Sequence, residues 1–474
     1  MLEGKFRIYP VSREVSADIE TPVSAFYALR EESGRCFLLE SVETSEKLGR
    51  YSFLGFEPEL EFVARQDKVR VTFRGETEEY ENGNPVQELS RILSLFSEER
   101  SEELPPFSAG LVGYFGYDTV RYFERLPDTK PDRLNLPDIH LMMPKVLVAF
   151  DHIRQKLVLI TYTYDPEDRT AALELLKKYE EKLYSGKKPL RIRESGQGKI
   201  SLTSNFRKEA FLEAVEQCKR YIVAGDIFQV VISQRFKTET SLPSFDIYRK
   251  LRMINPSPYM FYFDMGNCEL VGTSPEVMVK RMKDEDKDEV LLRPIAGTRK
   301  RGRNREEDLA IEQDLLHDRK ELAEHTMLLD LARNDIGRIS EFNTVRVEQA
   351  FHIERYSHVM HLVSDVFGKP KEGTTPVGVI GATFPAGTVS GSPKVRAMEI
   401  IEELEPEKRG VYAGAIGYID FRGNTDTCIA IRTIVLKDGV AYLQAGAGIV
   451  YDSVPEKEYE ETINKAKALM KALV

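Results

Sequence analysis

Three glutamates have types and spacings that could hold a metal ion. Glu458 and Glu461 are three residues apart near the start of a predicted C-terminal helix, so their carboxylates project from one face. Glu324 lies in another predicted helix, among apolar neighbours that indicate packing. Carboxylates that converge from separate helices suit a hard cation such as Mg²⁺, which keeps several waters and takes further ligands from a substrate. Spacing alone leaves open that these glutamates are merely solvated.

Small residues and an arginine near the C-terminus could bind an anion. Gly446, Ala447 and Gly448 in LQAGAGIV are predicted to end a strand, where small residues let backbone N–H groups approach an anion in the manner of a nest. Arg432, in the neighbouring predicted strand, offers a planar fork suited to a carboxylate. A tight strand end and a structural ion pair are the alternatives.

Three further motifs are incomplete for the chemistry that they resemble. FPAGTVSGSPK, residues 384–394, is a small-residue loop before a predicted helix, but it lacks the Gly-Lys-Ser/Thr run of a phosphate loop. His358 and His361 are spaced as on one helix face, but no third zinc ligand accompanies them, so a core or hydrogen-bonding histidine is favoured. The basic run RKRGRNR, residues 299–305, is followed at once by EED, which favours a solvated, mobile segment over a nucleic-acid patch.

The first part of the chain predicts short antiparallel strands and one clear helix. Apolar and polar residues alternate in CFLLESVE, YSFLGFEPELEF and KVRVTFRGE. RTAALELLKKYEEKLY has helical spacing and ends at a polar stretch over 186–203, which we expect to be a linker or exposed crossing. Since 474 residues exceed one compact core, we expect an N-terminal region over 1–185 and a second region over 204–474.

The second region predicts a helix, a series of strands, a long helix and a closing meander. Ser204 or Asn205 can cap the first helix, and Gly225 can stop it. A long helix is predicted over 306–331, and the hairpin dipeptide Asp438-Gly439 separates the last two strands. The predicted strands are 227–236, 258–265, 268–274, 276–282, 290–297, 414–421, 428–436 and 440–450, and a final helix covers 456–473.

Composition narrows the class of protein. Hydrophobic residues make up 42% and charged residues 30%, which is typical of a folded chain, and the net charge of −10 gives no reason to expect nucleic acid as a partner. The four cysteines are scattered without a CxxC pair, which favours a reducing compartment. Without a signal core or a long apolar run, we expect a cytoplasmic protein that does not enter a membrane.

Ordered motifs along the chain resemble the chorismate-binding enzymes and, within them, the anthranilate synthase large subunits. The motifs are GDIFQVVISQRF, NPSPYMFYF, VGTSPE, RPIAGTRKRG, AEHTMLLDLARNDIGR, ERYSHVMHLVSDV, FPAGTVSGSPK, YAGAIGY and GAGIVYDSVPEKEYEETINKA. They span about 205–467, and LLESVE and GRYSFLG resemble the family's N-terminal region. The resemblance implies an α+β fold of two packed, largely antiparallel β-sheets forming a sandwich, with helices outside and the active-site cleft between the sheets.

The resemblance also implies roles for individual residues. It implies that Glu324, Glu458 and Glu461 bind Mg²⁺, which neutralises a substrate carboxylate. The residues implied to contact chorismate are Gly297, Thr298, Tyr412, Arg432, Gly446, Ala447 and Gly448. The residues implied to be catalytic are Glu276 and His361, placed for proton transfer, together with Thr388 and Gln229.

The implied reaction joins two steps in one site. Ammonia adds at a ring carbon as the 4-hydroxyl group leaves, and pyruvate is then eliminated to give anthranilate, the first committed step of tryptophan synthesis. Hydroxide is a poor leaving group, so a general acid and a metal-neutralised carboxylate are what lower the barrier.

Two positions separate this interpretation from related activities. Isochorismate and salicylate synthases carry a water-activating lysine where this chain has Gln229, and an amide cannot serve as that base. Aminodeoxychorismate synthases of folate synthesis typically carry a lysine where this chain has Ala296. Aminodeoxychorismate synthase remains the alternative enzyme, and a non-catalytic, tryptophan-sensing subunit is the alternative of another class.

The resemblance implies a protein partner and an inhibitor. None of the four cysteines has the Gly-x-Cys-x-Gly setting of a glutaminase, so a separate glutamine amidotransferase small subunit is implied as the source of ammonia. LLESVE and NPSPYM resemble the family's tryptophan feedback site, so the candidate effector-binding residues are Glu40, Ser41, Pro258, Tyr259 and Met260. The alternative is that Ser41 is an ordinary strand residue and that the prolines only shape a turn.

Overall fold

The computed structural model describes most of the chain. The described ranges are 4–30, 34–41, 49–81, 83–99, 101, 103–185, 191–193, 201–356 and 359–474. Most of the expected linker over 186–203, and His358, lie outside them. The division of the chain at 186–203 therefore stays a prediction.

The described part of the chain contains runs of consecutive strands separated by helices. The strands are β1 Phe6–Ser16, β2 Cys36–Glu40, β3 Tyr51–Arg65, β4 Lys68–Phe73, β5 Glu76–Tyr80, β6 Phe96–Glu98, β7 Gly110–Phe115, β8 Ile139–Asp151, β9 Lys156–Thr163, β10 Thr203–Ser204, β11 Gln229–Glu239, β12 Tyr259–Asp264, β13 Glu269–Ser274, β14 Val277–Lys283, β15 Asp288–Leu292, β16 Ile295–Lys300, β17 Arg346–Arg355, β18 Val359–Gly368, β19 Gly391–Ser392, β20 Ala415–Asp420, β21 Thr425–Ile429, β22 Thr433–Lys437 and β23 Val440–Ile449. The helices are α1 Pro22–Leu29, α2 Pro85–Leu95, α3 Thr170–Ser185, α4 Lys208–Ala224, α5 Ser244–Ile254, α6 Arg305–His317, α7 Arg319–Ile339, α8 Pro376–Thr383, α9 Lys394–Leu404 and α10 Pro455–Met470, with short 3-10 turns η2 Tyr117–Tyr122 and η3 Gly387–Val389. None of the helices so described combines the length and apolar composition that a membrane crossing needs.

Two antiparallel arms of sheet meet where β3 pairs with β8. From β3, one arm continues through β2, β12, β13, β22 and β23 to β11. From β8, the other continues through β7, β20, β21, β14 and β15 to β18. A buried cluster that includes Phe37 and Phe261 of the first arm and Tyr114 and Ile416 of the second lies between them. The predicted α+β fold with two packed β layers is thus confirmed.

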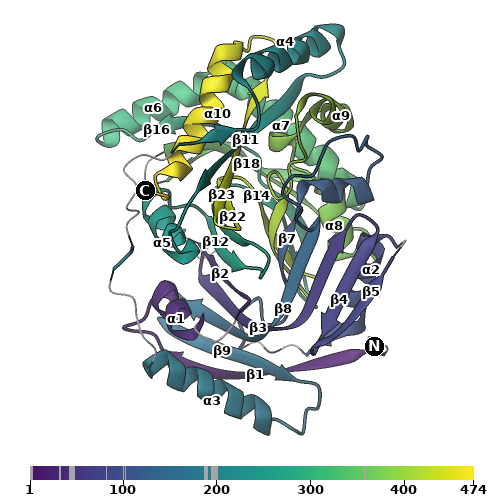
Figure 1. Cartoon of the computed structure of the whole chain (residues 1–474), viewed down its shortest axis with the longest axis vertical. Helices are drawn as coiled ribbons and strands as arrows, with labels where there is room; N and C mark the ends of the chain where they lie inside the picture. Colours follow the sequence, from purple (N-terminus) through teal and green to yellow (C-terminus); the bar gives the residue numbers. More distant parts are fainter. Residues whose placement is uncertain are drawn as a thin grey trace.

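Helices cover the outer faces of the two arms because each buries one apolar stripe. On the first arm, α10 packs against β23 and α5 against β13; on the second, α7 packs against β18 and α8 against β14. Figure 1 shows α4 and α10 side by side at one end of the molecule, with α1 and α3 at the other. The helices α7 and α10, which carry Glu324, Glu458 and Glu461, belong to the end of the molecule that carries α4.

Two helix predictions were wrong in detail. The expected single helix over 306–331 is broken at Asp318, whose carboxylate accepts from the N–H groups of Lys320 and Glu321 and so starts α7. Helix α4 begins at Lys208, and neither predicted cap is used. The Ser204 hydroxyl instead donates to Gln234 Oε1, and Asn205 Oδ1 accepts from the Arg235 N–H. Its predicted stop at Gly225, with φ +84°, is confirmed.

The closing meander is divided differently from the prediction. The strand expected over 428–436 is two strands, β21 and β22, interrupted at Arg432, which has a left-handed φ of +50°. That conformation is unusual for a residue with a side chain and is incompatible with a continuous strand. The hairpin turn at Asp438 and Gly439, with φ +51° and +76°, is confirmed.

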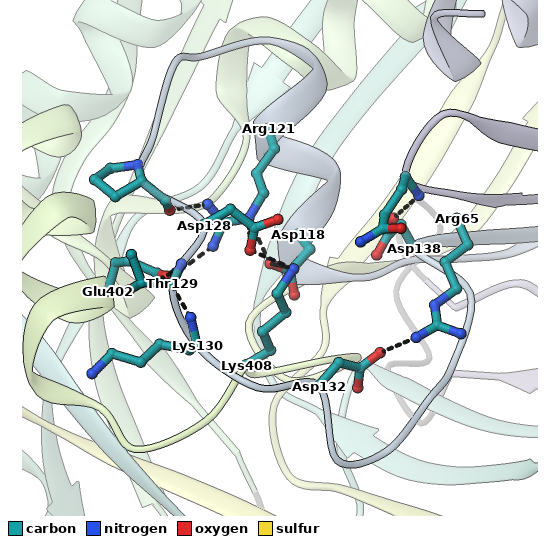
Figure 2. A network of polar contacts seen from close by, with 12 residues as sticks. Arg65, Asp118, Arg121, Asp128, Thr129, Lys130, Asp132, Asp138, Glu402 and Lys408 are labelled. Carbon is teal, nitrogen blue, oxygen red and sulfur yellow. Dashed lines mark hydrogen bonds and ion pairs between the residues drawn. The ribbon is translucent and has the colours of Figure 1, made fainter. Parts of the chain in front are cut away.

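A network of charges ties the segment after β7 to the end of α9 (Figure 2). The Arg121 guanidinium donates to Asp118 at 2.8 Å and to Glu402 at 2.8 Å. The Lys408 ammonium pairs with Asp128 at 2.6 Å. Since Glu402 follows Arg121 by 281 residues, these contacts connect distant parts of the sequence.

Candidate active site and a second cavity

The larger cavity of interest has a volume of about 1570 Å³ and is lined by most of the predicted site residues. It lies among β11, β16, β18, β23, α7, α10 and the loop before α9. The predicted residues in its wall are Gln229, Pro258, Glu276, Gly297, Thr298, Glu324, His361, Thr388, Tyr412, Arg432, Gly446, Gly448, Glu458 and Glu461. Segments from 229 to 461 therefore converge on one space large enough for a small-molecule substrate.

The three glutamates predicted to bind metal face this cavity from two helices. Glu324 projects from α7, and Glu458 and Glu461 project from α10. Burial raises the pKa of Glu324 and of Glu458, and the charge of Glu461 raises both pKa values further. Within the described ranges, no three acidic, histidine or cysteine side chains are already grouped to hold a metal ion. The three candidate ligands are nevertheless all carboxylates. A hard cation bound between them would relieve the repulsion between their negative charges.

Glu276 is a buried carboxyl group held by the loop before α9. It is 9% exposed, and the Thr388 hydroxyl donates to its Oε1 at 3.0 Å. Burial raises the pKa of Glu276 to about 7, although the Thr388 hydrogen bond and the charge of Arg432 lower it. A carboxyl group with such a pKa is partly protonated at neutral pH and can exchange protons with a bound molecule.

His361 is oriented by β16, which lies beside its own strand β18. Its Nδ1 is 3.1 Å from the Gly297 carbonyl oxygen and 3.1 Å from the Thr298 hydroxyl. Because a carbonyl only accepts, Nδ1 carries the proton and Nε2 is left as an acceptor. Burial lowers the pKa of His361, which keeps the imidazole neutral. The geometry therefore provides a neutral base.

The glycines near the end of β23 do not form the expected turn. Gly446 and Gly448 lie within the strand and pair with β11, so the prediction of a nest was wrong. A Cβ at Gly446 would be 2.9 Å from the Tyr412 hydroxyl, and one at Gly448 would be 2.5 Å from Gln229 Nε2. Ala447 points to the other face and is fully buried in the hydrophobic core. Glycine is needed here because Tyr412 and Gln229 approach the backbone closely.

Lys465 is a cavity residue that sequence reasoning missed. Its ammonium group donates to the Gly446 carbonyl at 2.9 Å and pairs with Glu461 at 2.7 Å. The sequence did contain a signal for this ion pair, because Lys465 follows Glu461 by four residues and the two share a helix face. It adds positive charge to a cavity that Arg432 also lines.

The basic run over 299–305 is not a free positive patch. Arg299 pairs with Asp314, Asp318 and Glu321, and its backbone belongs to β16. Arg301 pairs with Asp308 of α6. Because acids of α6 and α7 neutralise these arginines, the run offers little to a polyanion.

A second cavity, of about 850 Å³, is lined by all the residues predicted to bind an effector. They are Glu40, Ser41, Pro258, Tyr259 and Met260. The pairing of β2 with β12 brings them together, because Glu40 lies opposite Met260. Arg252 donates to the Glu40 carboxylate at 3.1 Å, and the Tyr259 hydroxyl donates to Asp426 at 2.8 Å.

The two cavities share a wall. Pro258, Pro275, Ile295 and Tyr356 line both of them. The Tyr356 ring also contacts the His361 ring edge-on, with centroids 5.5 Å apart. A ligand in the smaller cavity would therefore touch residues that also form the larger one.

Comparison with known proteins identifies the family of this chain. The family model described as chorismate binding enzyme matches residues 34–471. Anthranilate synthase component 1 from Acetivibrio thermocellus is 48% identical over 477 residues, which cover 99% of this chain and 96% of that protein. The crystal structure of anthranilate synthase component I from Streptococcus pneumoniae TIGR4 has a TM-score of 0.80 at 38% identity and covers 96% of this chain and 98% of that one. The menaquinone-specific isochorismate synthase from Escherichia coli shares the fold, with a TM-score of 0.73 at 18% identity over 100% of this chain and 97% of that one. The chain thus belongs to the chorismate binding enzyme family.

Proposed function

We propose that this chain is component 1 of an anthranilate synthase, a cytoplasmic lyase that converts chorismate and ammonia to anthranilate and pyruvate for tryptophan biosynthesis. The observation that carries the proposal is the larger cavity, which combines facing carboxylates, a buried acid and a neutral histidine. The near full-length identity to anthranilate synthase component 1 of A. thermocellus supports it.

In this proposal, chorismate, which carries two carboxylates, binds between β23, β16 and α10. Arg432 offers a planar fork to one carboxylate, while Tyr412 and Thr298 contribute hydroxyl groups from the cavity wall. Mg²⁺, held by Glu324, Glu458 and Glu461, supplies positive charge that neutralises a substrate carboxylate. Lys465 lies beside Glu461 and adds to the positive charge that faces the substrate.

The protein residues then supply the proton transfers. Glu276, partly protonated at neutral pH, donates a proton to the 4-hydroxyl group, which leaves as water while ammonia forms the new C–N bond. His361 is the base that takes the ring C–H proton as the C–O bond to the enolpyruvyl group breaks and the ring becomes aromatic. The enolpyruvate that leaves takes up a proton at its methylene carbon and so becomes pyruvate. The buried amide of Gln229 orients the ammonia but cannot activate water, which separates the reaction from isochorismate formation.

The ammonia comes from a glutamine amidotransferase subunit in a heterooligomer. All four cysteines are buried thiols, which fits a reducing compartment. Burial raises the pKa of the Cys218 and Cys268 thiols to about 12, which leaves them inert as nucleophiles. Tryptophan is proposed to bind in the smaller cavity and to inhibit allosterically through the shared wall.

The test is a product assay on the isolated chain with chorismate, MgCl₂ and an ammonium salt. Anthranilate is expected, identified by its fluorescence and its mass. Isochorismate, salicylate or aminodeoxychorismate as the product would reject the proposal. The absence of any turnover, with tryptophan still bound, would favour the non-catalytic sensing subunit.

A further inference from the structure

Arg409 is a buried arginine between the end of α9 and Tyr412. Only 2% of the residue is exposed, and it is among the largest fully buried side chains of the described residues. It does not line the catalytic cavity, but several residues that contact it do. A buried guanidinium needs a partner for its charge and acceptors for its N–H groups. The groups that serve as these partners are therefore the ones that Arg409 holds in place.

Four hydrogen bonds fix the Arg409 guanidinium. Its Nε and Nη2 donate to the two carboxylate oxygens of Glu405, at 3.0 and 2.6 Å. Its Nη1 donates to the Val389 carbonyl at 2.7 Å, and its Nη2 also donates to the Val231 carbonyl at 2.7 Å. The rigid fork of an arginine can make these contacts together, whereas a lysine ammonium would lose most of them.

The two carbonyls belong to the wall of the catalytic cavity. Val231 lies in β11 opposite Gly448 and lines the cavity. Val389 directly follows Thr388, whose hydroxyl donates to Glu276. Arg409 therefore joins strand β11 to the loop that holds the buried acid.

The Arg409 guanidinium also lies over the ring of Tyr412, a residue proposed to contact the substrate. Its central carbon is 5.6 Å from the centroid of the Tyr412 ring and 4.7 Å from that of Tyr117. Cation–π contacts of this kind favour particular ring orientations. The Tyr412 hydroxyl lies against Gly446 in the cavity, so the ring has little freedom once Arg409 is in place.

We infer that Arg409 is a positioning residue for chorismate turnover, acting through Tyr412 and through the Thr388 loop. This inference rests on the proposed function, because chorismate turnover is its readout. Stability alone explains the residue poorly, since a buried ion pair such as Arg409–Glu405 is often no more stabilising than well-packed apolar side chains. The Arg409 guanidinium also holds two carbonyl groups and a tyrosine ring that form part of the cavity wall, which a role in stability alone does not require.

The test compares Arg409→Lys with the wild-type chain and with a matched control. Arg409→Lys keeps the charge but loses the fork, and kcat/KM for chorismate is expected to fall by about tenfold or more. Arg121→Lys makes the same change in the network of Figure 2, which does not line the cavity. It is expected to lower Tm but to leave kcat/KM per folded molecule unchanged.

A double-mutant cycle tests the route through Tyr412. Arg409→Lys and Tyr412→Phe each lower kcat/KM by some factor. The double variant is expected to lower kcat/KM by less than the product of these two factors, because both changes act on one ring. Should Arg409→Lys not fold, the pair Arg409→Met and Glu405→Met, which removes both charges, takes its place with the same expectations.

Three results would overturn the inference: an unchanged kcat/KM in the folded Arg409 variant, an equal loss in Arg121→Lys, or fully multiplicative losses with Tyr412→Phe. A wild-type chain that does not turn over chorismate would overturn the proposed function, and this inference with it. An active wild type with an unaffected Arg409 variant would overturn the inference alone.

Discussion

Replacing Glu276 with glutamine should stabilise the protein at alkaline pH while removing most of its activity. Burial raises the pKa of this carboxyl group from 4.5 to about 7 in the folded state. The unfolded chain therefore ionises first as the pH rises, and the folded state loses stability between about pH 4.5 and about pH 7. At about 1.4 kcal/mol per pKa unit, the full loss is about 3.5 kcal/mol above that window.

The amide of a glutamine carries no charge, so the Glu276→Gln variant escapes this loss. The free energy of unfolding of the variant, measured relative to that of the wild type, should thus be about 3 kcal/mol larger at about pH 8 than at about pH 4.5. The amide oxygen can still accept from Thr388, so the local packing is retained. Loss of the proton donor should lower kcat by about 10²- to 10⁴-fold.

Urea unfolding followed by circular dichroism at both pH values measures the stability difference, and anthranilate fluorescence measures turnover at a fixed concentration of free ammonia. Glu98→Gln is the matched control when tryptophan is left out of the assay, because burial also raises the pKa of Glu98 to about 7 and Glu98 lines the smaller cavity, not the larger one. It should reproduce the stability effect without loss of kcat. A Glu276→Gln stability difference that is the same at both pH values, or near-normal turnover, would refute the reasoning.

The other predictions concern the metal ligands, the strand glycines and the effector cavity. Glu461→Gln should lower kcat/KM for chorismate by about a hundredfold and weaken the Mg²⁺-supported binding of chorismate. Calorimetric titration of chorismate with and without MgCl₂ measures this binding. If its dependence on MgCl₂ is unchanged, Glu461 is not a metal ligand. Gly448→Ala places a Cβ 2.5 Å from Gln229 Nε2 and should raise the KM for ammonia by about tenfold or more, so a normal KM would exclude Gln229 from ammonia binding. Ser41→Ala should raise the tryptophan inhibition constant by about tenfold, the equivalent of one lost hydrogen bond, with maximal rate intact, and an unaltered inhibition curve would remove Ser41 from the site.

Local pattern predicted most elements but not where they break. Strand alternation, the Gly225 stop and the Asp438-Gly439 hairpin depend on neighbouring residues, and all three are observed. The break between α6 and α7 depends on Asp318 capping a new helix, and the break at Arg432 depends on a left-handed residue between two strands. Neither interruption leaves a mark in the apolar periodicity, because polar and charged residues continue across Asp318 and apolar residues lie on both sides of Arg432.

The site shows the same division between local and long-range information. From the chain alone one could predict that Glu458 and Glu461 share a helix face, because the helical repeat places residues three apart together. Most of the residues that the motifs predicted for the site line one cavity. The space between α7 and α10 depends on which apolar faces the sheet arms bury, so only the tertiary structure brings Glu324 to the same cavity.

The sequence by itself determined the local elements, the chemistry of the candidate residues and the family, since these depend on residue type, short spacing and the order of motifs. The tertiary structure decided the pairing of β2 with β12 that builds the second cavity, the direction of Ala447 away from the site, and the burial of Arg409 beneath it. These features arise from long-range packing, in which each contact joins residues that are far apart in the chain. No local pattern carries that information.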